Sequence, residues 1–100
     1  FDISQAVKEL EEYKPKIGDY LDLMNIWFRD VLLYKATGDE RKITFQDEKM
    51  IIKRQASECS YHGLNTIIQA ENTARRRIAC NGNYNLAVEL MLLSIKENIA

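Results

Sequence analysis

The chain of 100 residues is 46% hydrophobic and 29% charged, and it has a formal net charge of −1. This balance is typical of one folded domain and argues against a disordered segment. The near-neutral charge removes any global electrostatic reason to bind nucleic acid or an acidic membrane surface, and no apolar run approaches the roughly 18 residues of a membrane span. Because the chain begins at Phe1 and its first residues already show a helical pattern, we expect residues 1–100 to be a single helical domain from a longer protein.

The first predicted helix runs from Asp2 to Tyr13, with apolar residues at helical spacing on one side and charged residues on the other. Ser4 is its predicted N-cap. Pro15 closes this helix, and the same proline suits the first turn of the next helix, where a missing N–H costs nothing. We therefore expect a short connection to the second helix.

The second predicted helix, Lys16–Thr37, is the element around which the rest of the chain is arranged. Its apolar residues cover an arc of roughly half the circumference. The arc consists of Leu21, Leu23, Met24, Trp27, Phe28, Val31, Leu32 and Tyr34. Gly38, just past the helix, predicts its end. So wide an arc places the helix at the centre of a bundle or beneath a second protein chain.

Two further helices follow. The third begins at Thr44, which forms a capping-box pattern with Asp47, and ends near Cys59. The fourth runs from Tyr61 to Ala79 with Ser60 as its N-cap. Their predicted core stripes are Phe45, Ile52, Ala56 and Cys59, thickened by Met50 and Ile51, and then Leu64, Ile67, Ile68, Ala74 and Ile78.

The last predicted helix, Tyr84–Ile99, is capped by Asn83 and has two apolar stripes on nearly opposite sides. One stripe is Leu86, Leu90 and Leu93, and the other is Val88, Leu92, Ile95 and Ile99. The chain is therefore predicted to be all-α, a bundle of about five helices. A domain of this size cannot easily bury so many apolar faces alone, which indicates an interface with another protein.

Few residues suggest catalytic or metal chemistry. The glycines form no phosphate-binding loop, and the single histidine, His62, has no nucleophile beside it in a recognisable motif. Cys59 and His62 have the spacing of half a zinc site, with Cys80 as a third possible ligand, but a second paired motif is missing. We expect reduced thiols, no metal, no cofactor and no enzymatic activity.

Several charged residues have two or more interpretations. The arginine run at residues 75–77 is suited to the last turn of a helix, and a partner contact or nucleic-acid binding are its alternatives. Glu71 and Arg75 lie four apart on the apolar stripe of their helix, where an acid and a base should be paired. The pair either fixes packing or reaches a subunit interface, and Asp22 and Arg29 have the same alternatives. Trp27 is expected in the core, with an interface anchor as the alternative.

Two stretches of the sequence resemble a known family. Residues 25–38 are NIWFRDVLLYKATG, and residues 74–83 are ARRRIACNGN, followed by LAVELMLL at residues 86–93. In this order and spacing, they resemble the C-terminal collar domain of the delta-prime subunit of bacterial DNA polymerase III, in the clamp-loader family. The resemblance covers about residues 10–93.

This resemblance implies a non-catalytic domain for oligomerisation. In the family, the helical C-terminal domains of several subunits form a collar that holds the clamp loader together while ATPase modules work below it. The implied partners are the delta and gamma/tau subunits in the cytoplasmic bacterial replisome, with no direct contact to nucleic acid, membrane or metal. The candidate structural or subunit-interface residues are Trp27, Arg29, Asp30, Glu71, Arg75, Asn81, Asn83 and Glu89.

Two other functions stay open as alternatives. A small free-standing helical enzyme of mutase type would need Arg75 or Arg29 to converge with a lysine and a glutamate in a concave pocket. A helical DNA-binding module rests on the arginine run alone and would bind DNA in a salt-dependent way.

Overall fold

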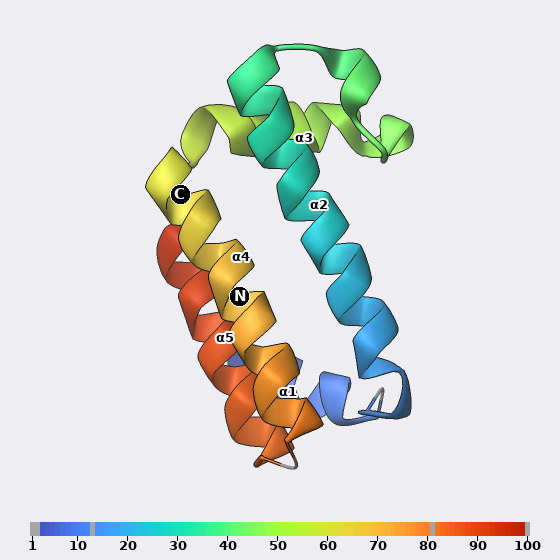
Figure 1. Ribbon diagram of the computed structural model, residues 1–100, viewed down its shortest axis with the longest axis vertical. Helices are drawn as coiled ribbons and strands as arrows, with labels where there is room; N and C mark the ends of the chain where they lie inside the picture. The colour runs from blue at the N-terminus through green and yellow to red at the C-terminus, as the bar shows by residue number, and fades with distance from the viewer. Residues whose placement is uncertain (1–2, 13, 81, 100) are drawn as a thin grey trace.

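The structure, a computed structural model, describes residues 3–12, 14–80 and 82–99. Over these residues the chain forms five α-helices and three short 3-10 helices, with no strand. The α-helices are α1 (Ile3–Glu11), α2 (Ile17–Thr37), α3 (Lys49–Glu58), α4 (Tyr61–Ala79) and α5 (Tyr84–Asn98) (Figure 1). The 3-10 helices are η1 (Lys14–Lys16), η2 (Glu40–Lys42) and η3 (Gln46–Glu48). The prediction of an all-α bundle is confirmed.

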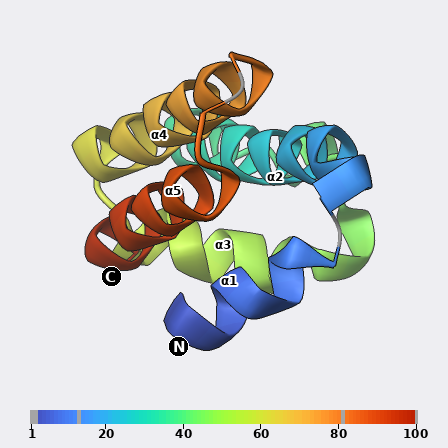
Figure 2. The same cartoon turned by 90° about the horizontal axis from the view of Figure 1, so that it is seen from below.

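Helix α4 packs against both α2 and α5, and it runs antiparallel to each of them (Figure 1). Helix α3 packs across the C-terminal half of α2, and α1 lies along α5 (Figure 2). The bundle is elongated, with principal extents of 39 × 23 × 23 Å. Because so slender a bundle has few layers, α2 and α5 each keep one side that no other described helix covers. No helix within the described ranges is long and apolar enough to cross a membrane.

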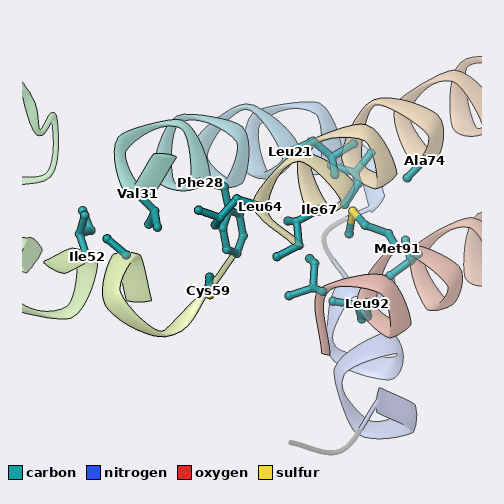
Figure 3. Close-up of a cluster of buried hydrophobic side chains, with 14 of the residues drawn as sticks. Leu21, Phe28, Val31, Ile52, Cys59, Leu64, Ile67, Ala74, Met91 and Leu92 are labelled. Atoms are coloured by element: carbon teal, nitrogen blue, oxygen red, sulfur yellow. The ribbon is translucent and has the colours of Figure 1, made fainter. Parts of the chain in front are cut away.

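The hydrophobic core lies where α2, α4 and α5 meet and continues to the contact of α2 with α3 (Figure 3). Among its most deeply buried side chains are Leu21, Val31, Ile52, Leu64, Ile67, Val88 and Met91. These residues recur at helical spacing within each helix, so burial of one stripe per helix supplies most of the stability. The predictions that Met50 and Ile51 thicken the core stripe are wrong, because both side chains are exposed, and Leu23 in the wide arc of α2 is exposed as well.

Three predicted helix ends are confirmed. Gly38 has a φ of 68°, in the left-handed region that favours glycine, and its N–H donates to the Tyr34 carbonyl and closes α2. The Ser60 hydroxyl accepts from the Gly63 N–H at 2.9 Å at the start of α4. The Asn83 side chain accepts from the Leu86 N–H at 3.0 Å at the start of α5.

Three other predicted signals are corrected. Ser4 lies inside α1, which already begins at Ile3 within the described residues. Pro15 lies in the separate 3-10 helix η1, so α2 begins after it and not around it. Thr44 does not cap α3, because its hydroxyl is bound to Asp30 of α2 and the helix begins only at Lys49.

The turn between α4 and α5 requires a residue without a side chain. The Gly82 N–H donates to the Arg77 carbonyl at 2.8 Å, and a Cβ on Gly82 would lie only 2.7 Å from that oxygen. This close approach lets the chain reverse within a few residues, which sets α5 antiparallel to α4.

Candidate functional site

An apolar ridge runs along the outward side of α5. It consists of Leu86, Leu90 and Leu93, which are 51%, 40% and 37% exposed. At 100° per residue these leucines point directly away from the buried side of the same helix, which carries Val88 and Met91. The ridge is therefore not a loosely packed part of the core. It is a second apolar side that no described helix covers.

Two of the predicted site residues lie close to this ridge, one beside it and one at its N-terminal end. Glu89 is exposed and lies one turn after Leu86. Asn83 is the N-cap that fixes where α5 begins and hence which residues face outward. Asn81, which was also predicted as a site residue, lies outside the described residues.

A second surface feature is a groove on α2. It has a volume of about 510 Å³ and is lined on α2 by Ile26, Arg29, Leu33 and neighbouring residues, and by Lys42 from the following connector. The Arg29 side chain is exposed. Arg29 was predicted as a structural or subunit-interface residue, and it lines this groove.

Asp30 closes one wall of the groove and is 5% exposed. One carboxylate oxygen accepts from the Thr44 N–H at 2.8 Å and from the Phe45 N–H at 3.2 Å, and the other accepts from the Thr44 hydroxyl at 3.1 Å. A buried carboxylate needs such donors, and here they all come from one loop. Asp30 therefore ties the connector after η2 to α2.

Replacing Asp30 with alanine is expected to lower the free energy of unfolding by about 2 kcal/mol, because two backbone N–H groups lose a charged acceptor. Asp30→Asn keeps one acceptor oxygen and should lose about half as much. Urea denaturation of the two variants and the wild type measures both values. A loss below about 0.5 kcal/mol for alanine would show that water replaces the carboxylate without cost.

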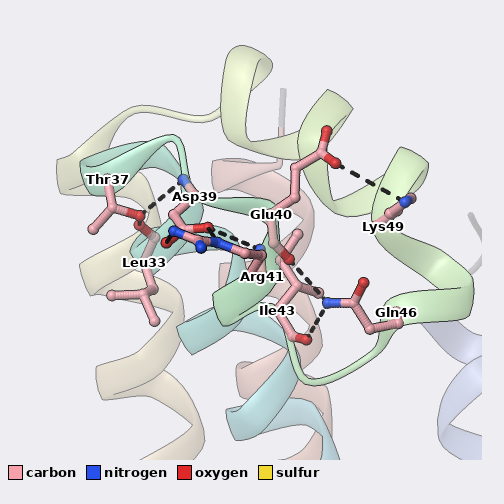
Figure 4. Close-up of polar contacts among 8 residues, drawn as sticks. All are labelled: Leu33, Thr37, Asp39, Glu40, Arg41, Ile43, Gln46 and Lys49. Atoms are coloured by element: carbon pink, nitrogen blue, oxygen red, sulfur yellow. Dashed lines mark hydrogen bonds and ion pairs between the residues drawn. The ribbon is translucent and has the colours of Figure 1, made fainter.

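The connector between α2 and α3 is held by further polar contacts (Figure 4). The Gln46 side-chain amide donates to the carbonyls of Glu40 and Ile43 at 2.9 and 2.7 Å. Lys49 and Lys53 of α3 form ion pairs with Glu40. The hydrogen bond from Lys53, together with its charge, lowers the pKa of the Glu40 carboxyl. These contacts hold the connector in place beside the groove.

Arg75 of α4 is paired with Asp22 of α2, at 2.7 Å between Nη2 and Oδ1. The prediction that Arg75 pairs with Glu71 on its own helix is therefore wrong, and Asp22 is paired with Arg75 and not with Arg29. An arginine on a helix reaches a neighbouring helix as easily as its own next turn, and Asp22 offers a partner that needs less desolvation. The pair ties α2 to α4 across their contact.

Glu71 is left as a buried acid. It is 2% exposed, and both carboxylate oxygens lack a hydrogen-bond partner among the described residues. Burial raises the pKa of Glu71 to about 7, against the opposing effect of the Arg75 charge. The Asn25 side-chain oxygen on α2 is also buried without a partner there.

The Asp22–Arg75 pair shows how these two buried groups are placed. Helices α2 and α4 are antiparallel, so one turn forward from Asp22 and one turn back from Arg75 reach the same level of their contact. Those positions are Asn25 and Glu71. A protonated Glu71 has an O–H donor, which an ionised carboxylate lacks.

Trp27 lies where α2, α3 and the connector meet, and it is half-buried. Its indole N–H donates to the Gln55 side-chain oxygen at 2.8 Å, and its ring packs 5.6 Å from that of Phe45, centroid to centroid. A smaller apolar pocket of about 310 Å³ beside it is lined by Leu23, Met24, Trp27, Phe28 and Phe45. Trp27 is on a different side of α2 from the groove.

The cysteines and the histidine do not form a cluster. Both cysteines are free; Cys59 is buried and Cys80 is exposed at the opposite end of α4 from His62. Within the described ranges, no group of three or more His, Cys, Asp and Glu side chains is placed to hold a metal ion.

The sequence did not predict several contacts around the α2 groove, Trp27 and α5. Thr44 and Gln55 acquire their roles from residues of α2 that are more than ten positions away, and Lys42 lines a groove whose other lining residues are mostly on α2. Asn25 belongs to the resembling stretch at residues 25–38, but nothing local in that stretch predicts that its side-chain oxygen is buried. Tyr84 ties α1 to α5 by donating to the Leu10 carbonyl at 2.7 Å, and burial raises the pKa of its hydroxyl.

Comparison with known proteins gives one match. A search of curated proteins and a search of solved structures each found no significant match. The family model described as DNA polymerase III, delta subunit, C terminal matches residues 1–97. That match covers every helix described above except the last residue of α5, and it includes the α5 ridge and the α2 groove. The chain therefore belongs to the family of C-terminal domains of the DNA polymerase III delta subunit, a clamp-loader family.

Proposed function

We propose that this chain is the collar domain of a clamp-loader subunit of the delta-prime type, and that it holds neighbouring subunits together without catalysing a reaction itself. Its partners under this proposal are the delta and gamma/tau subunits in the cytoplasmic bacterial replisome. The two matched stretches support the delta-prime assignment. The first contains Trp27, Arg29 and Asp30 in the middle of α2, and the second ends at Asn83, the cap of α5.

The observation that carries the proposal is the exposed leucine ridge on α5. Leu86, Leu90 and Leu93 form a continuous apolar stripe opposite the buried side of the helix. Contiguous apolar surface of this kind is typical of sites where proteins associate. In a family of clamp-loader domains, a neighbouring subunit is the natural cover for it.

The observations give less support to the two alternatives. A mutase-type site would need an arginine, a lysine and a glutamate together. Arg75 is paired with Asp22 on the surface, and the described lining of the α2 groove has Arg29 and Lys42 but no glutamate. The DNA-binding alternative rests on residues 75–77, where one arginine is already engaged by Asp22.

Replacing Leu90 with glutamate is expected to weaken the association with a neighbouring subunit at least tenfold, because a charge would be buried at the centre of the ridge. Sedimentation velocity of the chain alone and mixed with the delta and gamma/tau subunits measures this. Met50→Glu is the matched control, since Met50 is an exposed apolar residue on α3, away from the ridge. Both variants should keep the wild-type circular dichroism spectrum. A wild-type chain that binds neither subunit, or that forms a stable homodimer, would contradict the proposed function.

A further inference from the structure

The α2 groove has an unusual combination of lining residues. Its floor is apolar, with Ile26, Leu33 and Ala36 spaced along the outward side of α2. Two cations, Arg29 and Lys42, also line it. Neither forms a salt bridge with any residue in the described ranges, although the charge of Lys42 is near enough to Asp39 to help lower the pKa of that carboxyl. An apolar groove with two cations that form no salt bridge fits an apolar segment that also has negative charge.

The groove does not supply that negative charge itself. Asp30 is its one acidic lining residue among those described, and both of its oxygens already accept hydrogen bonds from Thr44 and Phe45. Moving the Asp30 carboxylate toward Arg29 or Lys42 would leave buried N–H groups of the connector without an acceptor. The donors of the two cations therefore stay available to a ligand.

The α5 ridge has the complementary pattern. Its leucines lie at positions i, i+4 and i+7, and the exposed charged residues beside them are Glu89, Glu97 and Lys96, so that acids outnumber bases. Leu86 and Leu93 are about 10 Å apart along the helix axis, and Ile26 and Ala36 are about 15 Å apart, so a ridge of this length fits within the groove. The ridge and the groove lie on α5 and α2, which pack against different sides of α4 (Figure 1).

We propose that the α2 groove binds a helix of a neighbouring clamp-loader subunit that presents leucines at i, i+4 and i+7 with an acidic residue beside them, as α5 of this chain does. The proposal rests on the collar function proposed above and adds which two surfaces meet. Each domain then contacts one neighbouring subunit through its α5 ridge and the other through its α2 groove. Such a head-to-tail contact joins different surfaces and extends into a ring or an open arc.

The test uses two groove variants, each with a control that makes the same change elsewhere. Arg29→Glu reverses a groove cation, and Arg54→Glu reverses an exposed arginine on α3 that does not line the groove. Leu33→Glu places a charge on the groove floor, and Met50→Glu places one on exposed α3. All four chains are mixed separately with the delta and with the gamma/tau subunit and studied by sedimentation velocity, after circular dichroism shows that they are folded.

Both groove variants are expected to lose at least tenfold in affinity for one subunit and to bind the other like the wild type. The ridge variant Leu90→Glu should show the opposite pattern. If the wild type binds a subunit and the groove variants bind as their controls do, the groove proposal is overturned while the collar function stands. Loss of the same subunit by ridge and groove variants would also overturn it. If the wild type binds neither subunit, the collar function fails first, and the groove proposal fails with it.

Discussion

Glu71→Gln is expected to make the domain more stable than the wild type above pH 7 and to remove a pH dependence that the wild type shows. Glu71 is buried, has no hydrogen-bond partner among the described residues and has a pKa of about 7 in the folded chain. Glutamine has nearly the same shape and is never ionised. Its amide also supplies N–H donors, which an ionised carboxylate lacks.

The direction of the pH effect follows from the two pKa values of Glu71. The ordinary pKa of 4.5 applies when the chain is unfolded, and burial raises it to about 7 in the folded state. Between these values the folded state binds more protons, so the stabilising contribution is full below pH 4.5 and is lost as the pH rises through 7. The total loss from this one group is about 3 kcal/mol. Arg75, the nearest cation along the helix, is engaged by Asp22 and offsets only part of it.

Urea denaturation at about pH 5 and at about pH 8 measures this effect. The free energy of unfolding of the wild type should fall by about 2 to 3 kcal/mol between these conditions relative to Glu71→Gln. Glu58→Gln makes the same change at an exposed position of α3 and should follow the wild type. Parallel pH profiles for the wild type and Glu71→Gln would mean that Glu71 is ionised and solvated in the folded chain.

Trp27→Ala is expected to lower the free energy of unfolding by about 3–5 kcal/mol, the usual cost of removing a large aromatic side chain from a packed site. The indole joins three parts of the chain: it lies on α2, donates to Gln55 of α3 and packs on Phe45 of the connector. Its loss would therefore loosen the contact between α2 and α3. Because the total stability of a domain of this size is about 5–15 kcal/mol, the variant should be only marginally folded.

Thermal and urea denaturation measure the effect of Trp27→Ala on the free energy of unfolding. Trp27→Phe separates the contribution of ring packing on Phe45 from that of the hydrogen bond to Gln55. Phenylalanine keeps a ring against Phe45 but loses the N–H bond to Gln55, so it should cost only about 1 kcal/mol. Trp27→Phe also stays folded for the sedimentation test with the delta and gamma/tau subunits. An alanine variant with unchanged stability that no longer binds a subunit would identify Trp27 as an interface anchor.

The two predictions concern two different constraints on the packing of the bundle. Trp27 holds the α2–α3 junction, and with it the connector that carries Lys42 and Thr44 to the groove. Glu71 lies between helices whose relative position determines how far the α2 groove is from the α5 ridge. Loosening the α2–α3 junction, or ionising the buried Glu71, would therefore disturb the packing that positions both proposed interfaces with neighbouring subunits, even though neither residue lines the ridge or the groove.

Local features of the sequence determined the helices. The ends at Gly38, Ser60 and Asn83 depend on backbone and side-chain groups within four residues of each other, so the sequence alone contains both partners of each contact. The apolar spacing in α4 and α5 similarly predicted which residues share a side. For this reason α4 was predicted with the bounds that the structure has, and α5 to within one residue.

Only the tertiary structure decided which apolar stripe is buried and which partner a polar side chain binds, where the sequence offers several equivalent possibilities. The two stripes of α5 are about equally apolar, and packing on α4 buries one and leaves Leu86, Leu90 and Leu93 outside. Arg75 had an acid on its own helix, yet its partner is Asp22, 53 positions away. The sequence around Thr44 predicted a local capping role, but its N–H and hydroxyl donate to Asp30. Each outcome depends on how far one helix lies from another, and that distance is set by the packing of the whole bundle.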